Sequence, residues 1–306
     1  MKILCLGNQK GGVSKSTASL NIAYSLANTY DQKVLLVDCD SQGSSSLNLG
    51  IPIDSEDIHT LDKILEPVVL NKVQGFSWEA VKQCIYTPTY QDRERDPDNK
   101  MNWIQVSKPF GFDAIPSNLY LSVVELQMGV VGGASRRGIY QHYLKDLLDV
   151  IEANSDYDYV IMDTAPSLSS MTINALSAAR DGVIVVSNTD IMSIRGVGSF
   201  IESTETVQEM NPNHRGILGI LLSLYSERRT VDRSIEEWVK EFLPIPTFDT
   251  RIPETSDVKK ANSSMLLVSQ INKKMKKAFD DVTYEIMYAV EHPSEPIGSA
   301  KHVGDE

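Results

Sequence analysis

The segment from Gly7 to Thr17, GNQKGGVSKST, constrains the fold of this chain more than any other. It follows a short apolar run at 2–6 and precedes a stretch at 16–28 in which apolar residues recur at helical spacing. A strand, a glycine-bearing loop and a helix in this order direct backbone N–H groups and the positive helix end toward one small volume. Such a volume suits a polyphosphate, so we expect a phosphate-binding loop here.

The loop departs from the P-loop pattern G-x-x-x-x-G-K-[ST] in two ways. Gln9 and Ser14 stand where the pattern has glycine, and a second lysine, Lys10, precedes Lys15. In a P-loop, Lys15 neutralises the β- and γ-phosphates and the hydroxyl of Ser16 binds Mg²⁺. Serine at position 14 is compatible with this role if its φ is negative, because losing glycine is costly mainly at positive φ.

Composition excludes several classes of protein. The chain has 306 residues, of which 42% are hydrophobic and 23% charged, so it can bury a substantial core. Its cysteines, Cys5, Cys39 and Cys84, form no C-x-x-C pair, which disfavours a zinc ribbon, an iron–sulfur ligand set or a disulfide framework and favours a cytoplasmic protein. The net charge of −12 argues against a uniformly basic surface but allows a local basic patch.

The pattern of the chain predicts an α/β fold. Short runs rich in β-branched residues alternate with longer amphipathic stretches, which indicates a doubly wound, mainly parallel sheet with helices on both faces. We expect strands at 2–6, 33–37, 112–115, 159–162, 182–187, 217–224 and 245–248. We expect helices at 16–28, 135–152, 169–180, 194–209, 231–241 and 262–290.

A single domain should cover residues 1–290. The stretch at 87–102, TPTYQDRERDPDNKMN, is polar, charged and interrupted by prolines, so we expect an exposed loop inserted in this domain. The tail at 291–306 combines prolines, glycines and charges with almost no large apolar residues, and we expect it to be flexible. The apolar run at 216–225 is about half as long as the roughly 20 residues that a membrane-spanning helix needs.

Three carboxylates follow buried strands. Asp38 and Asp40 end the run VLLVDCD, and Asp163 ends the run YDYVIMD. Ligands of open α/β sheets bind at such strand ends. Because side chains alternate along an extended chain, Asp38 and Asp40 should point to the same side, one toward a metal and the other toward an attacking water. Asp163 is expected to hold Mg²⁺ through water, whereas Asp40 could also be a turn or helix-capping residue.

The joint set of motifs closely resembles one family. KGGVSKST, VLLVDCDSQGSSS and DYVIMDTAPSLSSMTINAL resemble the deviant-Walker-A ATPases, specifically the ParA partition ATPases of the ParA/MinD superfamily of SIMIBI P-loop proteins. Further matches lie at 112–118, 183–200, 217–230 and 250–261, so the resemblance covers residues 1–288. It differs from many members in having Ser14 and the run Asp-Cys-Asp-Ser-Gln, which puts the rate of hydrolysis in question.

The resemblance implies an ATPase that uses ATP and Mg²⁺ and is active as a dimer. Lys10 is implied to reach across a nucleotide-sandwich dimer to the partner's ATP, as an arginine finger does in trans. The implied catalytic residues are Lys10, Lys15 and Asp40, with Asp40 acting on the water, and the implied metal shell is Ser16, Asp38 and Asp163. The implied nucleotide-binding residues are Lys10, Gly11, Gly12, Val13, Ser14, Lys15, Ser16, Thr17, Arg228 and Pro253.

Within this superfamily, the sequence favours the partition branch. The tail lacks the basic amphipathic helix with which the MinD branch binds membranes, and the paired cysteines of the iron-protein branch are missing. Partition ATPases bind nonspecific DNA as ATP dimers, so the resemblance implies a homodimer, nonspecific DNA and a centromere-binding adaptor as partners, no membrane, and a cytoplasmic location on the nucleoid. The DNA-binding candidates, each of which could instead lie on a solvated helix face, are Arg228, Arg229, Arg233, Lys259, Lys260, Lys273, Lys274, Lys276 and Lys277.

Three functions therefore remain open. The favoured one is an ATP-dependent, dimerising ATPase that segregates plasmid or chromosomal DNA. The second is a ParA-like positioner of a cargo other than DNA, and the third is an ATP-dependent metabolic ligase of the same superfamily. Lys10 favours the first two, because its implied role requires a dimer.

Overall fold

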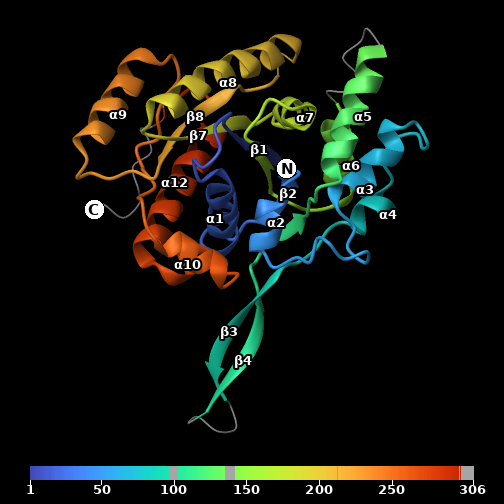
Figure 1. Cartoon of the computed structure of the whole chain (residues 1–306), viewed down its shortest axis with the longest axis horizontal. Helices are drawn as coiled ribbons and strands as arrows, with labels where there is room; N and C mark the ends of the chain where they lie inside the picture. The colour runs from blue at the N-terminus through green and yellow to red at the C-terminus, as the bar shows by residue number, and fades with distance from the viewer. Residues whose placement is uncertain (97–101, 135–141, 212, 296, 298–306) are drawn as a thin grey trace.

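A six-stranded parallel sheet forms the centre of the molecule (Figure 1). The structure, a computed structural model, describes residues 1–96, 102–134, 142–211, 213–295 and 297. The strands lie in the order β5-β2-β6-β1-β7-β8. Their bounds are β1 Lys2–Gly7, β2 Val34–Cys39, β5 Asp113–Ile115, β6 Tyr159–Thr164, β7 Gly182–Asn188 and β8 Ile217–Ser223.

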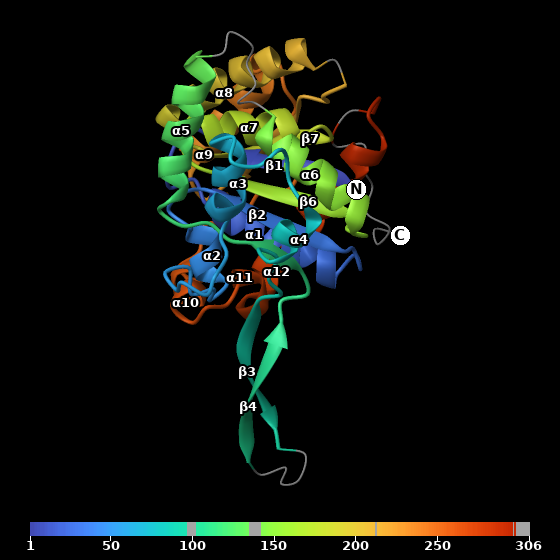
Figure 2. The ribbon, with the colours of Figure 1, turned by 90° about the vertical axis from the view of Figure 1, so that its right-hand side faces the viewer.

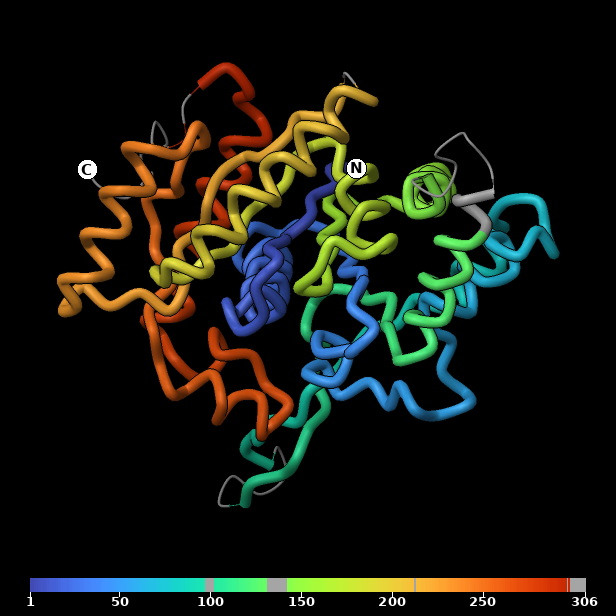
Figure 3. The backbone as a smooth tube through the Cα atoms, turned by 45° about the horizontal axis from the view of Figure 1, so that its top comes forward, coloured from blue at the N-terminus to red at the C-terminus, as the bar shows by residue number. Residues whose placement is uncertain are grey.

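Helices cover both faces of this sheet (Figures 1 and 3). The near-continuous apolar runs of β2 and β6 are buried at every position, as expected for strands with a helical layer on each side. One face packs mainly against α1 (Lys15–Asn28), α10 (Asp257–Ser263), α11 (Val268–Ile271) and α12 (Lys273–Glu291). The other face packs against α3 (Leu61–Val69), α4 (Trp78–Lys82), α5 (Leu121–Ala134), α6 (Tyr143–Asn154), α7 (Ser170–Ala178), α8 (Ile191–Met210) and α9 (Thr230–Phe242).

The fold class is confirmed, and two of the expected elements are wrong. Residues 245–248 form no strand of the sheet: Thr247 makes only an isolated bridge to Ile220, because Pro246 has no N–H to donate. The long helix expected at 262–290 is broken. Met265 adopts a φ of +50°, and the side chain of Asn272 accepts hydrogen bonds from two backbone N–H groups and so begins α12 as its N-cap.

Helices α3 and α5 and the short α2 (Ser44–Asn48) and α4 lie outside the ranges expected from sequence. In α3 the buried residues Leu61, Ile64, Leu65 and Val69 follow helical spacing, so this helix could have been recognised. In α5 the sequence VVGG is unfavourable for a helix, because valine and glycine have low helix propensity, yet the helix continues through it. The first part of the helix expected at 135–152 falls on residues 135–141, outside the described part of the chain.

The expected loop at 87–102 instead contains a strand that belongs to a two-stranded ribbon, and its residues 97–101 lie outside the described part of the chain. Strands β3 (Thr89–Arg95) and β4 (Trp103–Pro109) pair antiparallel along their whole length. Figure 2 shows the ribbon extending well away from the body. The strands were not predicted because most side chains of the ribbon face solvent rather than a core, so its sequence is polar and resembles that of a loop. Most of the tail expected at 291–306 lies outside the described residues, although Ile297 packs against the core beside α12.

Candidate functional site

The glycine-bearing loop leads directly from β1 into the first turn of α1. Gly12 has a φ of +78°, and Ser14, the N-cap residue of α1, has a φ of +62°. The condition of a negative φ, under which serine at position 14 is compatible with the loop, is therefore not met. Serine occupies a left-handed position that favours glycine, because its Cβ crowds the backbone there. The loop is further held by Ser223 at the end of β8, whose hydroxyl donates to the carbonyl oxygen of Val13 at 2.7 Å.

The sheet brings two of the three predicted carboxylates together. Asp38 on β2 and Asp163 on β6 are direct partners in the register of adjacent parallel strands. Both side chains are fully buried at the carboxyl end of the sheet, below the loop that carries Lys15. This is the edge where ligands of open α/β sheets bind, so strand order places the two charges where the sequence predicted a site.

Three hydroxyl groups hold the carboxylate of Asp163. Ser19 of α1 donates to one oxygen at 2.9 Å and Ser45 of α2 to the other at 2.6 Å, while Ser16 donates a further hydrogen bond. Burial raises the pKa of Asp163, and the charge of Lys15 and these hydroxyls oppose the shift. Burial likewise lowers the pKa of Lys15, and the charge of Asp163 opposes that change. The lysine and the carboxylate therefore stabilise each other's charged forms.

Asp38 is held by the turn that follows its own strand. Its carboxylate accepts hydrogen bonds from the backbone N–H and the hydroxyl of Ser46, at 3.0 and 2.7 Å, and from the backbone N–H of Asp40 at 3.1 Å. Burial, aided by the neighbouring charge of Asp163, raises the pKa of Asp38 to about 7. The three donors oppose this rise, but they do not outweigh the loss of water.

A cavity of about 550 Å³ lies above these buried carboxylates. Asp40 lines it, and so do all seven residues from Gly11 to Thr17. Sequence reasoning missed several others that close the cavity from α2 and the turn before it, from the turn after β6 and from α10: Gln42, Ser44, Leu47, Asn48, Pro166 and Asn262. The run of serines and asparagine after Asp40 was a usable signal for α2, because such residues supply hydrogen bonds to strand-end carboxylates and phosphates.

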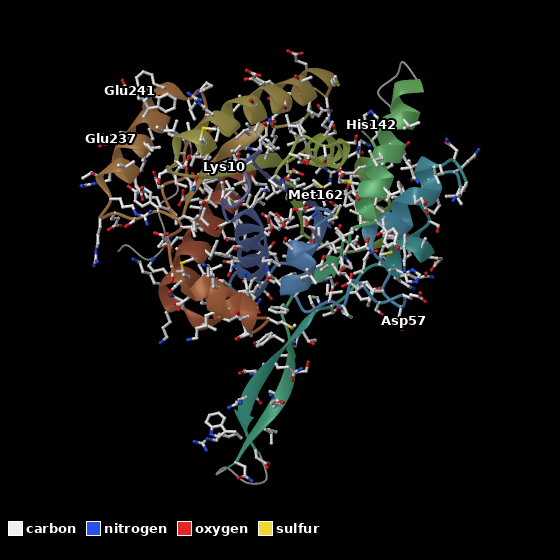
Figure 4. All side chains as sticks on the ribbon, in the orientation of Figure 1. Lys10, Asp57, His142, Met162, Glu237 and Glu241 are labelled. Carbon is white, nitrogen blue, oxygen red and sulfur yellow. The ribbon has the colours of Figure 1, made fainter. Side chains whose placement is uncertain are left out.

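Lys10, the second lysine of the loop, does not line this cavity. The ammonium of Lys10 lies 3.0 Å from a carboxylate oxygen of Asp190, which caps the N-terminus of α8. Figure 4 shows Lys10 beside α8. The side chain of Lys10 is about one-third exposed, and Lys10 does not line the cavity above the carboxylates of its own chain. Lys10 lowers the pKa of Asp190, mainly through its hydrogen bond to the carboxylate.

The two remaining nucleotide-binding candidates line a different cavity. Arg228 and Pro253 face a space of about 620 Å³ between the end of β8 and the first half of α12, together with Lys274 and Lys277. The backbone of Tyr225 pairs with that of Pro253, which brings the two segments together. The structure thus separates these residues from the cavity lined by Lys15 and Asp40.

Part of the cation cluster predicted in the C-terminal third is paired with carboxylates of the same chain. Lys276 and Lys277 pair with Asp280 and Asp281 one helical turn away, at 2.6 and 2.8 Å, and Arg229 pairs with Glu254. Among the described residues, no ion pair is found for Arg228, Arg233, Lys259, Lys260, Lys273 or Lys274.

Two features of the described residues bear on possible partners. No three His, Cys, Asp or Glu side chains there cluster closely enough to hold a metal ion on their own. No helix there has the length and apolar character needed to cross a membrane.

Known proteins similar to this chain share its fold over nearly its whole length. A family model described as an AAA domain matches residues 1–215. The chromosome partitioning protein ParA of Caulobacter vibrioides is 29% identical over 266 residues, which cover 86% of this chain and 84% of that protein. Cobyrinic acid a,c-diamide synthase of Mycobacterium smegmatis, solved with ADP and magnesium, is 25% identical with a TM-score of 0.72 and covers 98% of this chain and 99% of its own. McdA of Cyanothece, solved with ATP, has the same TM-score at 19% identity, covering 94% of this chain and 96% of its own.

Proposed function

The chain belongs to the ParA/MinD superfamily of P-loop ATPases, and on this premise we propose that it hydrolyses ATP in a cycle of dimerisation that segregates DNA. The observation that carries the proposal is the placement of Asp38 and Asp163 as register partners beneath the loop that holds Lys15. Two buried carboxylates beneath a lysine and a helix N-terminus suit a magnesium–polyphosphate complex. The positive metal ion matches the carboxylates, and the negative phosphates match the lysine and the helix N-terminus.

The residues of the cavity fit magnesium and a nucleotide. Mg²⁺ prefers oxygen ligands and is commonly held by one or two carboxylates together with substrate phosphates. Ser16, Asp38 and Asp163 would hold the metal, which polarises the phosphates when bound. The backbone of residues 11–17 and Lys15 would hold the phosphates, and Asp40, which lines the cavity, would orient a water molecule.

The position of Lys10 supports a dimer as the active species. In the single chain its ammonium is bound to Asp190, outside the phosphate cavity, so it does not serve that cavity in its own subunit. Both side chains of this ion pair are partly exposed, and such pairs contribute at most about 1 kcal/mol. Lys10 can therefore leave Asp190 at small cost and reach the phosphates bound by a second subunit, where a cation stabilises developing charge.

DNA and an adaptor protein complete the proposed cycle. The name of the Caulobacter relative ties this branch of the superfamily to chromosome partitioning. We infer nonspecific DNA binding by the ATP dimer through the lysines and arginines of the C-terminal third. The strongest candidates are those without an ion pair in the described structure: Arg228, Arg233, Lys259, Lys260, Lys273 and Lys274. A centromere-binding adaptor would stimulate hydrolysis and release the DNA.

Phosphate release and DNA binding, measured on the same protein, test the proposal. The protein should hydrolyse ATP only with Mg²⁺, and it should bind a random-sequence duplex with ATP more tightly than with ADP. Asp40→Ala should stop hydrolysis and leave an ATP dimer that sediments as two subunits. Asp57→Asn, which removes an exposed carboxylate, is the matched control and should behave like the parent protein.

Two outcomes would overturn the proposal. Parental turnover by Asp40→Ala would contradict the role of that residue. Turnover that needs a small metabolite, without any DNA binding, would instead assign the chain to the metabolic ligases. The structure of this chain is also similar to that of cobyrinic acid a,c-diamide synthase.

A further inference from the structure

The β3–β4 ribbon has no role in the proposed ATPase cycle. It projects away from the sheet and its helices in both views of the whole chain (Figures 1 and 2). A two-stranded ribbon is at best marginally stable alone in water, and this one carries a tryptophan, Trp103, that is 59% exposed. Tryptophan is enriched at interfaces, because its large ring can be buried while its N–H group finds a hydrogen-bond partner, so an exposed tryptophan on an extended arm is a candidate contact for a partner.

The pairing of the strands divides the side chains of the ribbon between two faces. Successive side chains in a strand alternate, and directly opposed residues share a face. The register pairs Arg93 with Gln105 and Arg95 with Trp103, whereas Asp92 pairs with Val106 and Glu94 with Ile104. One face, here the arginine face, comprises Gln91, Arg93, Arg95, Trp103, Gln105 and Ser107. The other, the acidic face, comprises Tyr90, Asp92, Glu94, Ile104, Val106 and Lys108.

The two faces differ in charge. On the acidic face, Lys108 lies 2.7 Å from Asp92 and 2.5 Å from Glu94, so the two carboxylates and the lysine sum to −1. The paired positions of the arginine face carry two guanidinium groups and no carboxylate, and Asp96 follows Arg95 directly in the chain. The guanidinium of Arg95 lies over the ring of Trp103, 4.2 Å from its centre, which orders both side chains. A chain with a net charge of −12 thus places two arginines on one face of an exposed ribbon.

We propose that the arginine face binds duplex DNA by entering the major groove. That groove admits a two-stranded β-ribbon, and several DNA-binding proteins insert strands into it. Arginine donates to guanine and glutamine pairs with adenine through the edges exposed there. Every side chain of the arginine face can donate a hydrogen bond, whereas the carboxylates of the acidic face would repel phosphates. The ribbon is then a DNA contact separate from the C-terminal cations, and it requires no nucleotide.

The position of the ribbon agrees with a continuous DNA surface. Helix α10, which carries Lys259 and Lys260, lies at the end of the body from which the ribbon projects (Figures 1, 2 and 3). Neither lysine makes an ion pair within the described residues. A duplex held by the arginine face could therefore also contact the cations of α10 through its phosphates.

Fluorescence anisotropy with a labelled random-sequence duplex of about two helical turns, roughly 20 bp, tests the proposal. The full chain is measured without nucleotide and with ATP. The variant Arg93→Gln/Arg95→Gln should lower the affinity on the order of tenfold or more and reduce the slope of log K against log salt by about 1 to 2. Lys108→Gln also removes a cation, but from the acidic face, and should change the affinity less than about twofold.

A second readout comes from Trp103, one of three tryptophans in the chain. Duplex DNA should change the tryptophan fluorescence of the parent protein, and Trp103→Phe should remove most of that change. An unlabelled single strand should compete poorly with the labelled duplex, because it has no major groove.

Three results would overturn the proposal. The first is equal DNA affinity of Arg93→Gln/Arg95→Gln and the parent protein in both nucleotide states. If Lys259→Gln/Lys260→Gln then lost ATP-dependent binding, the proposed function would stand and the ribbon assignment would fall. The second is equal competition by single-stranded DNA. The third is loss of self-association by the arginine variant with DNA binding retained, which would make the arginine face a contact between protein chains.

Discussion

The charged side chains of the strand-end site are buried, whereas those of the β3–β4 ribbon are largely exposed. At the site, Asp38, Asp163 and Lys15 are almost completely buried, and each depends on fixed hydrogen bonds or an opposite charge. In the ribbon, Arg93 and Trp103 are exposed, and their arrangement follows from strand alternation alone. A buried charge must be held by the whole fold, whereas an exposed one depends only on local pairing. Substitutions should therefore have different consequences in the two regions.

The largest effect is expected at Lys15. Lys15→Ala removes the cation that would bind the β- and γ-phosphates, and charge-assisted hydrogen bonds each contribute about 1.5–3 kcal/mol. ATP affinity, measured by titration calorimetry, should fall on the order of 100-fold. Lys33→Ala removes an exposed lysine that pairs with Asp156 and should leave ATP affinity unchanged. An equal loss in both variants would show that Lys15 has no special role.

Substitution of Lys10 should impair dimerisation without impairing ATP binding. Lys10→Ala should bind ATP with nearly parental affinity and fail to form the ATP dimer in sedimentation experiments, because its own cavity does not use this side chain. Asp190→Asn removes the partner that holds Lys10 and should strengthen the dimer by less than about fivefold, since partly exposed ion pairs contribute at most about 1 kcal/mol. Dimerisation that is intact in Lys10→Ala would argue against action in trans.

The buried carboxylate of Asp38 should make the stability of the nucleotide-free protein depend on pH. Because burial raises the pKa of Asp38 to about 7, its stabilising contribution is fully present below about pH 4 and is lost as the pH rises to about 7. The stability of the parent relative to Asp38→Asn should therefore fall over this range by a few kcal/mol, roughly. Urea unfolding at several pH values measures this difference, and a pH-independent difference would show that Asp38 stays ionised.

Ser14 offers a smaller test of the loop. Ser14→Gly should raise the free energy of unfolding by roughly 1 kcal/mol, since glycine adopts a φ of +62° without strain. Asn71→Gly, at a φ of +54°, is the matched control and should gain less, because asparagine tolerates this conformation. Thermal unfolding distinguishes the two variants, and a larger gain at Asn71 would contradict strain at Ser14.

The smallest effect on stability is expected from removing the ribbon. Replacing residues 92–106 by Asn-Gly joins Gln91 to Ser107 in a two-residue hairpin and keeps Tyr90, whose ring packs 5.1 Å from that of the buried Phe110. The free energy of unfolding should change by no more than about 0.5 kcal/mol. A loss of several kcal/mol would show that the ribbon belongs to the folding unit and would end the contrast between the two regions.

The sequence by itself determined most of the parallel sheet and the strand–loop–helix unit in which a phosphate-binding loop is predicted. Continuous apolar runs are unambiguous when both faces of a strand are buried, so β1, β2, β6 and β7 lie close to their expected ranges. Lys15, Asp40 and Asp163 were predicted as site residues because each stands at a fixed place in a strand–loop–helix or strand-end pattern, and their roles stay predictions.

Only the tertiary structure decided the features that depend on residues far apart in the chain. The φ of Ser14 is set by a loop tied to β8, and the partner of Lys10 lies 180 positions away at Asp190. The ribbon could not be predicted from the sequence, because its strands bury no core and therefore show no alternation of apolar and polar residues. Its cross-strand ion pairs can be identified only when the register of the two strands is known. Local patterns record burial and backbone preference, whereas pairing between distant side chains is a property of the folded chain.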